Sequence, residues 1–265
     1  MFCVFSLNCH SRMQIGLFLI GRWAGGMGMF SLSCGALILS VFSGQMVLAE
    51  PEAATILYIG DSHSHGGLGM RGGLDALLRN QSGYQLSFHA GCGTTTRQWM
   101  DGGAAPCKME KPYIFHERDG TKGGGKLTAK YQSLKDNVQR SGQKLFAITQ
   151  LGTNFASQLP QKIIENVNKL LLLIEPLRNG CIWIGPPSVD EDKARRNYPG
   201  LTNARIAAIE AAIVKALEGS QCHFISSRKF VADGGDGVHF SEAAGRRWAA
   251  DAYVQIKEQL KHDSN

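Results

Sequence analysis

The sequence predicts an α/β domain in which a parallel sheet of five strands is covered by helices on both faces. Two observations predict this class. Five short apolar runs rich in β-forming residues follow one another along the chain. They alternate with longer segments whose apolar residues recur at a helical period. This alternation is typical of parallel sheets, because each crossover between parallel strands places a helix over one face.

The expected strands are Ile56–Ile59, Tyr84–His89, Leu145–Leu151, Cys181–Gly185 and His223–Ser226. Helices are expected near residues 71–80, 127–141, 160–178, 202–218 and 242–260. In the third and fourth of these helices the apolar residues recur close to every 3.6 positions, which assigns those side chains to the core. The glycine-rich segment 101–126 predicts an irregular surface loop rather than a further domain.

The first 49 residues differ in composition from the rest of the chain. They contain no Asp or Glu and carry two apolar runs, Ile15–Ile20 and Cys34–Phe42. The second run is followed by Val47-Leu48-Ala49, which is typical of a secretory leader and its cleavage site. We expect a leader over residues 1–49 and a mature domain over residues 50–265, exported to the periplasm or secreted. Each run is shorter than the roughly 20 residues that span a bilayer, so we expect no membrane span after cleavage; an uncleaved anchor is the alternative.

Composition limits the class of protein. The chain is 43% hydrophobic and 19% charged, which fits one globular domain and excludes a disordered or fibrous chain. The formal net charge is +6, but the basic residues are scattered and form no run longer than two. A scattered distribution of this kind indicates a solvated surface, so we expect no nucleic-acid partner.

Four of the seven cysteines lie outside the predicted leader: Cys92, Cys107, Cys181 and Cys222. An even number in an exported domain favours disulfides, although three pairings are formally possible. Cys181 and Cys222 begin neighbouring strands in the expected order. We therefore expect these two to pair, which leaves Cys92 to join Cys107 and to tie the long loop.

Ser62 stands where the first strand ends. The buried run Ile56–Ile59 leads into Gly60-Asp61-Ser62, just before a turn. In open α/β sheets ligands bind at this carboxyl edge, and the first turn of a following helix offers backbone N–H groups to an oxyanion. Ser62 is therefore a candidate nucleophile, provided that other residues supply a base and an acid that orients the base.

The base and the acid are expected in one turn. Asp236-Gly237-Val238-His239 lies between the last strand and the last helix, also at the carboxyl edge of the sheet. The spacing lets the Asp236 carboxylate accept from one imidazole nitrogen while the other nitrogen faces the serine. The sequence therefore predicts a catalytic triad of Ser62, His239 and Asp236.

These two segments resemble the blocks of a known enzyme family. Gly60-Asp61-Ser62-His63-Ser64 is similar to the first block of the SGNH (GDSL-like) hydrolases, and Asp236-x-x-His239 is similar to their last block. Two middle blocks also stand in order: Gly91-Cys92-Gly93 after the second strand and Gly152-Thr153-Asn154 after the third. The resemblance covers residues 55–260 and implies a three-layer, flavodoxin-like sandwich.

The resemblance also implies an oxyanion hole and serine esterase activity. The hydrogen-bond donors of the oxyanion hole would be the backbone N–H groups of Ser62 and Gly93 and the side-chain amide of Asn154, with Gly91 as the alternative to Gly93. We expect no cofactor. His63 and His65 form a His-x-His pair that invites a metal interpretation, but no Cys, Asp or Glu with ligand spacing accompanies them, so we expect no metal.

Arg97 and Trp99 follow the second block and are expected near the cleft. They are candidate substrate-binding residues, since Arg binds carboxylates and Trp packs on sugar faces; Trp99 could equally pack against the long loop.

The expected function is hydrolysis of small acyl esters, acetyl foremost, with an O-acetylated envelope polysaccharide as the preferred substrate. Export and the polar, lysine-containing loop favour a glycan over a lipid. One alternative is a periplasmic lysophospholipase or thioesterase, and another is an inactive glycan-binding module on the same fold, because this fold hosts several activities.

Overall fold

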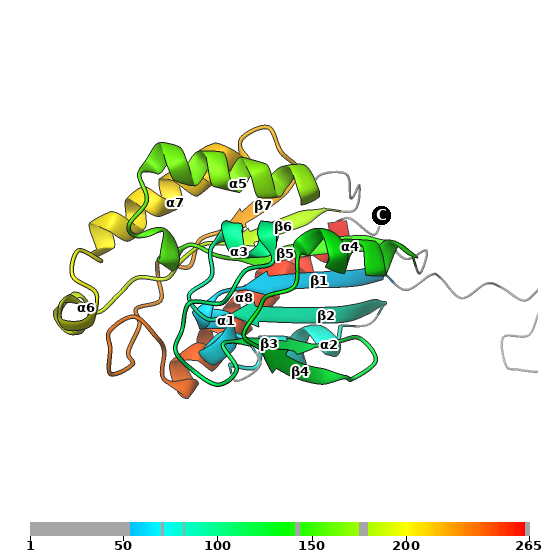
Figure 1. The fold of residues 1–265 in the computed structure, drawn as a ribbon, viewed down its shortest axis with the longest axis horizontal. Coiled ribbons are helices and arrows are strands. Elements are labelled where there is room, and N and C mark those ends of the chain that lie inside the picture. The colour runs from blue at the N-terminus through cyan, green and yellow to red at the C-terminus, as the bar shows by residue number, and fades with distance from the viewer. Residues whose placement is uncertain (1–53, 70–71, 82, 141–143, 175–179, 263–265) are drawn as a thin grey trace, which may run out of the picture. The chain divides into compact units, whose positions relative to one another are not determined.

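The computed structural model describes residues 54–69, 72–81, 83–140, 144–174 and 180–262, and the predicted leader lies outside these residues. The chain forms one sheet of seven strands in the order β4-β3-β2-β1-β5-β6-β7, with helices on both faces (Figure 1). Five neighbouring strands, β2, β1, β5, β6 and β7, pair in parallel. The α/β class and the five parallel strands are therefore confirmed, but the sheet has seven strands rather than five.

The five parallel strands coincide with the runs expected from the sequence. They are β1 (Ala54–Gly60), β2 (Tyr84–Gly91), β5 (Leu145–Gln150), β6 (Cys181–Ile184) and β7 (Cys222–Ile225). Every residue of β1 after Ala54 is buried, because the strand lies at the centre of the sheet with helices on either side. Continuous apolar runs of this kind are typical of strands covered on both faces.

The expectation of an irregular loop over residues 101–126 is wrong in part. This segment contributes β3 (Tyr113–His116) and β4 (Lys122–Gly125), an antiparallel hairpin that extends the sheet beyond β2. The Lys-Gly-Gly-Gly sequence of β4 has almost no side chains to alternate between two faces, so it carries no strand pattern. Its strand geometry comes from pairing with β3, a tertiary contact that local sequence does not encode.

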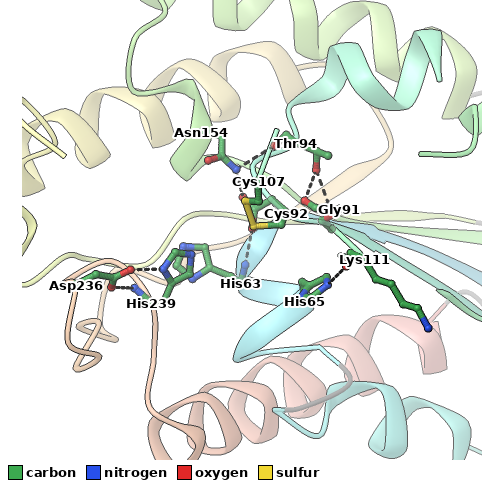
Figure 2. Close-up of a disulfide and its surroundings, with 12 residues drawn as sticks. His63, His65, Gly91, Cys92, Thr94, Cys107, Lys111, Asn154, Asp236 and His239 are labelled. Carbon is green, nitrogen blue, oxygen red and sulfur yellow. Dashed lines mark hydrogen bonds and ion pairs between the residues drawn. A yellow bond between two sulfur atoms is a disulfide. The ribbon is translucent and has the colours of Figure 1, made fainter. Parts of the chain in front are cut away.

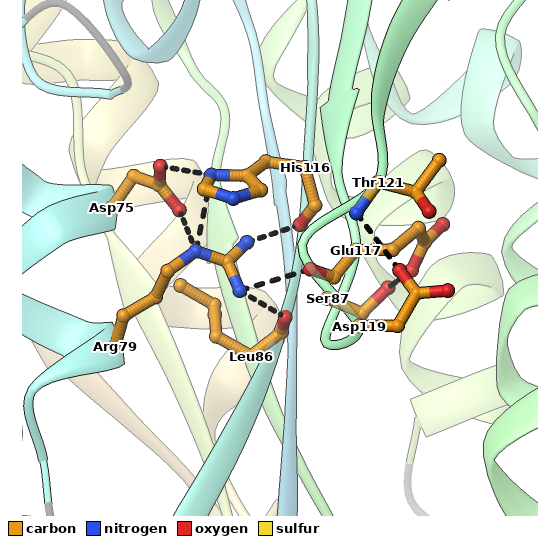
Figure 3. A network of polar contacts seen from close by, with 8 residues as sticks. All are labelled: Asp75, Arg79, Leu86, Ser87, His116, Glu117, Asp119 and Thr121. Carbon is orange, nitrogen blue, oxygen red and sulfur yellow. Dashed lines mark hydrogen bonds and ion pairs between the residues drawn. The ribbon is translucent and has the colours of Figure 1, made fainter.

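A partly buried arginine ties this hairpin to the rest of the domain (Figure 3). Arg79, at the end of α2 (Leu74–Arg79), donates to the carbonyl oxygens of Leu86 and Glu117, both at 3.0 Å. Its Nε lies 3.0 Å from a carboxylate oxygen of Asp75, and His116 Nδ1 lies 2.6 Å from the other. One guanidinium thus links a helix to two strands, as its planar set of donors allows.

The sheet divides the hydrophobic core into two layers. Leu57 and Ile59 of β1 face one side of the sheet and pack in the cluster formed with α3, α4, α5 and α7. Ile56 and Tyr58 face the other side and pack with residues of α2 and α8. The four longer helices are α4 (Tyr131–Arg140), α5 (Pro160–Ile174), α7 (Asn203–Leu217) and α8 (Glu242–His262), and all of them were predicted.

Three short helices were not predicted: α1 (Ser62–Gly66), α3 (Thr96–Asp101) and α6 (Glu191–Asn197). None of them is long enough to show an apolar stripe. In the chain, α1 follows β1, α3 follows β2 and α6 follows β6. All three contribute to the surroundings of the candidate site.

Both expected disulfides are present. Cys181 and Cys222 are register partners at the starts of β6 and β7, and Cys92 joins Cys107. The second bond fastens the long loop to the residue that follows β2. Within the described part of the chain, no helix is both long and apolar enough to cross a membrane.

Candidate active site

Ser62 is the first residue of α1, directly after β1 and the capping residue Asp61. The Asp61 carboxylate accepts from the backbone N–H of His63 at 3.0 Å, which fixes the start of the helix. Ser62 is 8% exposed and lines a cavity of about 560 Å³. The hydroxyl therefore stands at the carboxyl edge of the sheet, where the sequence placed it.

Asp236 and His239 lie in one tight turn between β7 and α8 (Figure 2). One carboxylate oxygen of Asp236 accepts from the backbone N–H groups of Val238 and His239, both at 2.9 Å. The other oxygen lies 2.6 Å from His239 Nδ1. The carboxylate is thus held by its own turn, and it contacts the imidazole of His239, which lines the cavity.

The ionisation of Asp236 fixes the tautomer of His239. Partial burial raises the pKa of Asp236, but hydrogen bonds from His239 and Val238 outweigh burial and bring that pKa down to about 2. An ionised carboxylate only accepts hydrogen bonds, so Nδ1 of His239 carries the proton in this pair. This leaves Nε2 without a proton in the neutral ring and able to act as a base.

A glycine allows this turn to pack closely on the protein. Gly237 has φ +76°, and a Cβ there would lie 2.4 Å from the backbone nitrogen of Ala194 in α6. The carbonyl of Gly237 also accepts from the backbone N–H of Asp190, at 2.9 Å. The start of α6 therefore supports the turn that carries Asp236 and His239.

Asn154 and Gly93 line the same cavity as Ser62 and His239. Asn154 lies in a single 3₁₀ turn, Thr153–Phe155, after β5. Its side-chain Nδ2 donates to the carbonyl of Thr94 at 3.1 Å and lies 3.4 Å from an Asp61 carboxylate oxygen. These two contacts hold the amide at the rim of the cavity.

The two candidate glycines have different surroundings. A Cβ at Gly91 would lie 2.4 Å from the Thr94 side chain, so this glycine allows Thr94 to pack against β2. Gly93 instead adopts φ +75° in the turn after the strand and borders the cavity. Gly93 remains the oxyanion candidate on this basis.

His63 lies beneath the site, next to the serine. Its side chain is 1% exposed, and its Nε2 lies 3.0 Å from the Thr153 hydroxyl. Burial lowers the pKa of His63 to about 3, with a smaller contribution from nearby His239, so the ring is neutral at physiological pH. His65 is also buried, and its Nε2 lies 3.0 Å from the carbonyl of Lys111. Among the described residues, no group of three or more His, Cys, Asp or Glu side chains is arranged to hold a metal ion.

Asp61 is a fully buried carboxyl group at the same place. Burial raises its pKa to about 7, and the hydrogen bond from His63 N–H and the nearby His239 partly oppose this rise. Asp61 thus titrates in the neutral range while it contacts the start of α1 and the amide of Asn154.

The expectation that Trp99 contacts substrate is wrong. Its side chain is fully buried, belongs to the core beneath α3 and meets the ring of Tyr113 edge-on. The short helix α3, capped by Thr95, turns this indole into the domain rather than toward the cleft. Arg97 is 81% exposed and lines a neighbouring hollow instead of the Ser62 cavity.

Sequence reasoning missed one wall of the cavity. Tyr198, Pro199, Gly200 and Leu201 follow α6 and line the cavity together with Pro106 and Cys107. Burial, followed by the charge of Asp236, raises the pKa of the Tyr198 hydroxyl. No motif marks residues 198–201, whereas the expected Cys92–Cys107 disulfide did bring Cys107 next to Gly93.

No family model matches the chain, and no curated protein matches it. Solved structures do match over nearly their whole length. A carbohydrate acetylesterase family member from Sinorhizobium meliloti is 16% identical, with a TM-score of 0.53 over 78% of this chain and 99% of that one. A lipase/acylhydrolase from Enterococcus faecalis is 18% identical, with a TM-score of 0.51 over 78% of this chain and 96% of that one.

The aryl esterase of M. smegmatis is 15% identical, with a TM-score of 0.51 over 78% of this chain and 100% of that one. At these identities the likeness concerns the fold. It agrees with the α/β sandwich expected from the four sequence blocks, because the matched part of the chain corresponds to almost the entire esterase structures. The chain therefore shares its fold with these esterases and this acylhydrolase.

Proposed function

We propose that this protein is an exported serine esterase that removes small acyl groups, acetyl foremost, from an envelope glycan. The observation that carries the proposal is the 2.6 Å contact between Asp236 and His239 Nδ1 at a cavity that Ser62, Gly93 and Asn154 also line. A candidate nucleophile, a candidate base held by a carboxylate, and candidate oxyanion donors thus border one cavity. This combination is what acyl transfer requires.

The reaction would proceed in two steps. His239 Nε2 takes the proton of the Ser62 hydroxyl as its oxygen bonds to the ester carbonyl carbon, and the backbone N–H groups of Ser62 and Gly93 and the amide of Asn154 stabilise the oxyanion. When the oxyanion collapses, the bond to the alcohol breaks and His239 returns the proton to that alcohol. Water then attacks the acyl-serine while His239 takes its proton. The bond between the Ser62 oxygen and the acyl carbon breaks, His239 returns the proton to that oxygen, and the acid and free Ser62 are released.

Export is supported by the two disulfides, which persist mainly in oxidising compartments. The secretory leader predicted from residues 1–49 points in the same direction. Some proteins of similar fold are described as carbohydrate acetylesterases, which is the observation in favour of an acetylated sugar as substrate.

The test is hydrolysis of 4-nitrophenyl acetate by purified protein, together with acetate release from an O-acetylated envelope polymer. We expect both activities in the wild type and neither in Ser62→Ala. Wild-type rates in correctly folded Ser62→Ala protein would refute the proposed nucleophile.

One observation favours a second candidate, an esterase for longer or aryl acyl groups. Pro106, Pro199, Leu201 and Val238 give the cavity an apolar side. Rates on 4-nitrophenyl esters from two to about eight carbons distinguish the candidates, because each methylene buried adds about 0.8 kcal/mol of binding. A steep fall of the hydrolysis rate with acyl chain length supports an acetylesterase, and a rise supports the second candidate.

A further inference from the structure

A second hollow lies beside the catalytic cavity, between α3 and α5. Its volume is about 640 Å³, and it is bordered by Arg97, Gln98, Gln158, Lys162, Asn166 and Lys169. Figure 1 shows α3 and α5 on the same side of the sheet. We call this hollow the α3–α5 groove. Apart from Met100, the residues that border it have polar or charged side chains, whereas prolines, Leu201 and Val238 contribute to the lining of the Ser62 cavity.

The groove and the catalytic cavity share two stretches of chain. The carbonyl of Thr94 accepts from the Asn154 amide at 3.1 Å, and the next residue, Thr95, borders the groove. Likewise, Ser157 lines the catalytic cavity and Gln158 borders the groove. The two hollows are therefore neighbours, and a chain-like substrate whose ester lies at Ser62 can extend into the groove.

The groove carries an excess of positive charge. Three cationic side chains border it, Arg97, Lys162 and Lys169, against the single carboxylate of Asp101. The Arg97–Asp101 pair spans 3.7 Å with the two side chains 81% and 67% exposed, and Lys162 pairs with Glu165 outside the lining at 2.8 Å. Exposed pairs of this kind contribute about 1 kcal/mol or less, so they yield readily to a ligand anion.

The spacing of the cations suits a repeating anion. Lys162 and Lys169 lie seven residues apart on one face of α5, which places them about 10 Å from each other along the helix axis. Arg97 lies across the groove on α3. The side-chain amides between them, including Gln158 and Asn166, which bond each other at 2.9 Å, can pair with hydroxyl groups.

We propose that the α3–α5 groove binds a carboxylate-bearing polysaccharide, so that the substrate class is an O-acylated acidic glycan. This inference rests on the proposed esterase function for the reacting ester but concerns a separate surface. Arg97 would hold a sugar carboxylate through its two parallel N–H donors, while the two lysines neutralise carboxylates further along the chain. Sugar hydroxyls would face the amides.

The first experiment measures binding without catalysis. Titration calorimetry compares Ser62→Ala with Ser62→Ala/Arg97→Gln/Lys162→Gln/Lys169→Gln, using unesterified polygalacturonate as the ligand. We expect the added substitutions to weaken binding at least about tenfold, and we expect raising the salt from about 0.02 M to about 0.5 M to weaken Ser62→Ala toward the same affinity. Equal affinity of the two proteins at low salt would overturn the proposal, whether or not the protein is an esterase.

The second experiment adds turnover and a matched control. The Arg97→Gln/Lys162→Gln/Lys169→Gln protein is assayed on O-acetylated polygalacturonate, on O-acetylated xylan as a neutral polymer and on 4-nitrophenyl acetate. The loss of kcat/KM on the acidic polymer should exceed the other two losses by about tenfold or more. The control Arg246→Gln/Lys257→Gln/Lys261→Gln removes three exposed cations from α8, on the opposite face of the sheet, and should behave as wild type.

The outcomes separate the two proposals. Equal losses on all three substrates would overturn the acidic-glycan inference and leave the esterase intact. Absence of hydrolysis of 4-nitrophenyl acetate by wild-type protein would instead refute the proposed function. The calorimetric comparison would still test whether the α3–α5 groove binds an acidic glycan.

Discussion

The imidazole rings of His63 and His239 lie side by side, with their centroids 5.4 Å apart. The His63 ring also reaches the Thr153 hydroxyl at 3.0 Å, next to Asn154 in the chain, and it is packed edge-on by Trp248. A single buried ring, one residue from the proposed nucleophile, thus lies against both the proposed base and the loop that carries Asn154. On this geometry we expect His63 to position the His239 ring and the Asn154 loop.

We predict that His63→Leu lowers kcat on 4-nitrophenyl acetate by about tenfold and changes KM little, because small displacements of catalytic groups are costly while the acyl cavity is retained. Steady-state kinetics give this split. Thr153→Val, which removes only the hydrogen bond, should have a smaller effect in the same direction. Wild-type kcat in His63→Leu would show that the ring serves packing alone.

The depressed pKa of His63 predicts an acid sensitivity. Burial holds this pKa near 3 instead of 6.5, so the folded protein resists a proton that the unfolded chain accepts. Stability from this group is present above pH 6.5 and is lost as the pH falls from about 6.5 toward 3. His63→Leu should therefore lose less free energy of unfolding between pH 7 and pH 4.5 than the wild type, as measured by urea denaturation. His223→Gln, at an exposed position on β7, should keep the wild-type difference.

Removal of the Asn154 amide tests the oxyanion hole. Asn154→Ala should lower kcat by about 100-fold or more with little change in KM, because the donor acts on charge that develops in the transition state. Asp236→Asn should also lower kcat, since an amide cannot hold His239 in the tautomer that accepts the Ser62 proton. A loss in Asn154→Ala that appears only in KM would place this residue in substrate binding instead.

The two disulfides are predicted to differ in what they support. Cys92–Cys107 closes 15 residues and borders the cavity, whereas Cys181–Cys222 closes 41 residues and joins the starts of β6 and the edge strand β7, outside the cavity lining. Each double Ala variant should lose about 2–4 kcal/mol of unfolding free energy. Only Cys92→Ala/Cys107→Ala should also lose activity at a temperature where both variants are folded, because Gly93 follows Cys92 directly. Equal residual activity of the two variants would contradict this distinction.

The parts of the fold with strong periodicity were predictable. The apolar stripe of α5 and the all-buried runs of β1 and β5 reflect positions in the core, and core burial is what sequence patterns record. The hairpin of β3 and β4 was not predictable, since Gly123 and Gly124 have no side chains that could show an alternation of polar and apolar residues. The helix α6 reads Glu-Asp-Lys-Ala-Arg-Arg-Asn, in which only Ala194 is buried, so it shows no stripe at all.

The candidate site was predictable as far as local motifs reach. Asp236 and His239 meet within one turn, so their contact follows from three-residue spacing. The wall at residues 198–201 depends on how α6 packs against Gly237, a tertiary relation with no sequence mark. The prediction that Trp99 contacts substrate was wrong for a similar reason, because proximity to a motif does not determine whether a helix turns a side chain inward or outward.

The central claim is that Ser62 is the nucleophile of an acyl transfer, and covalent labelling tests it most directly. Wild-type protein is treated with a fluorophosphonate, and the adduct is located by peptide mass spectrometry. The account predicts one adduct, on Ser62, that is absent in Ser62→Ala and forms far more slowly in His239→Ala. An adduct on another residue, or continued ester hydrolysis by fully labelled protein, would contradict it.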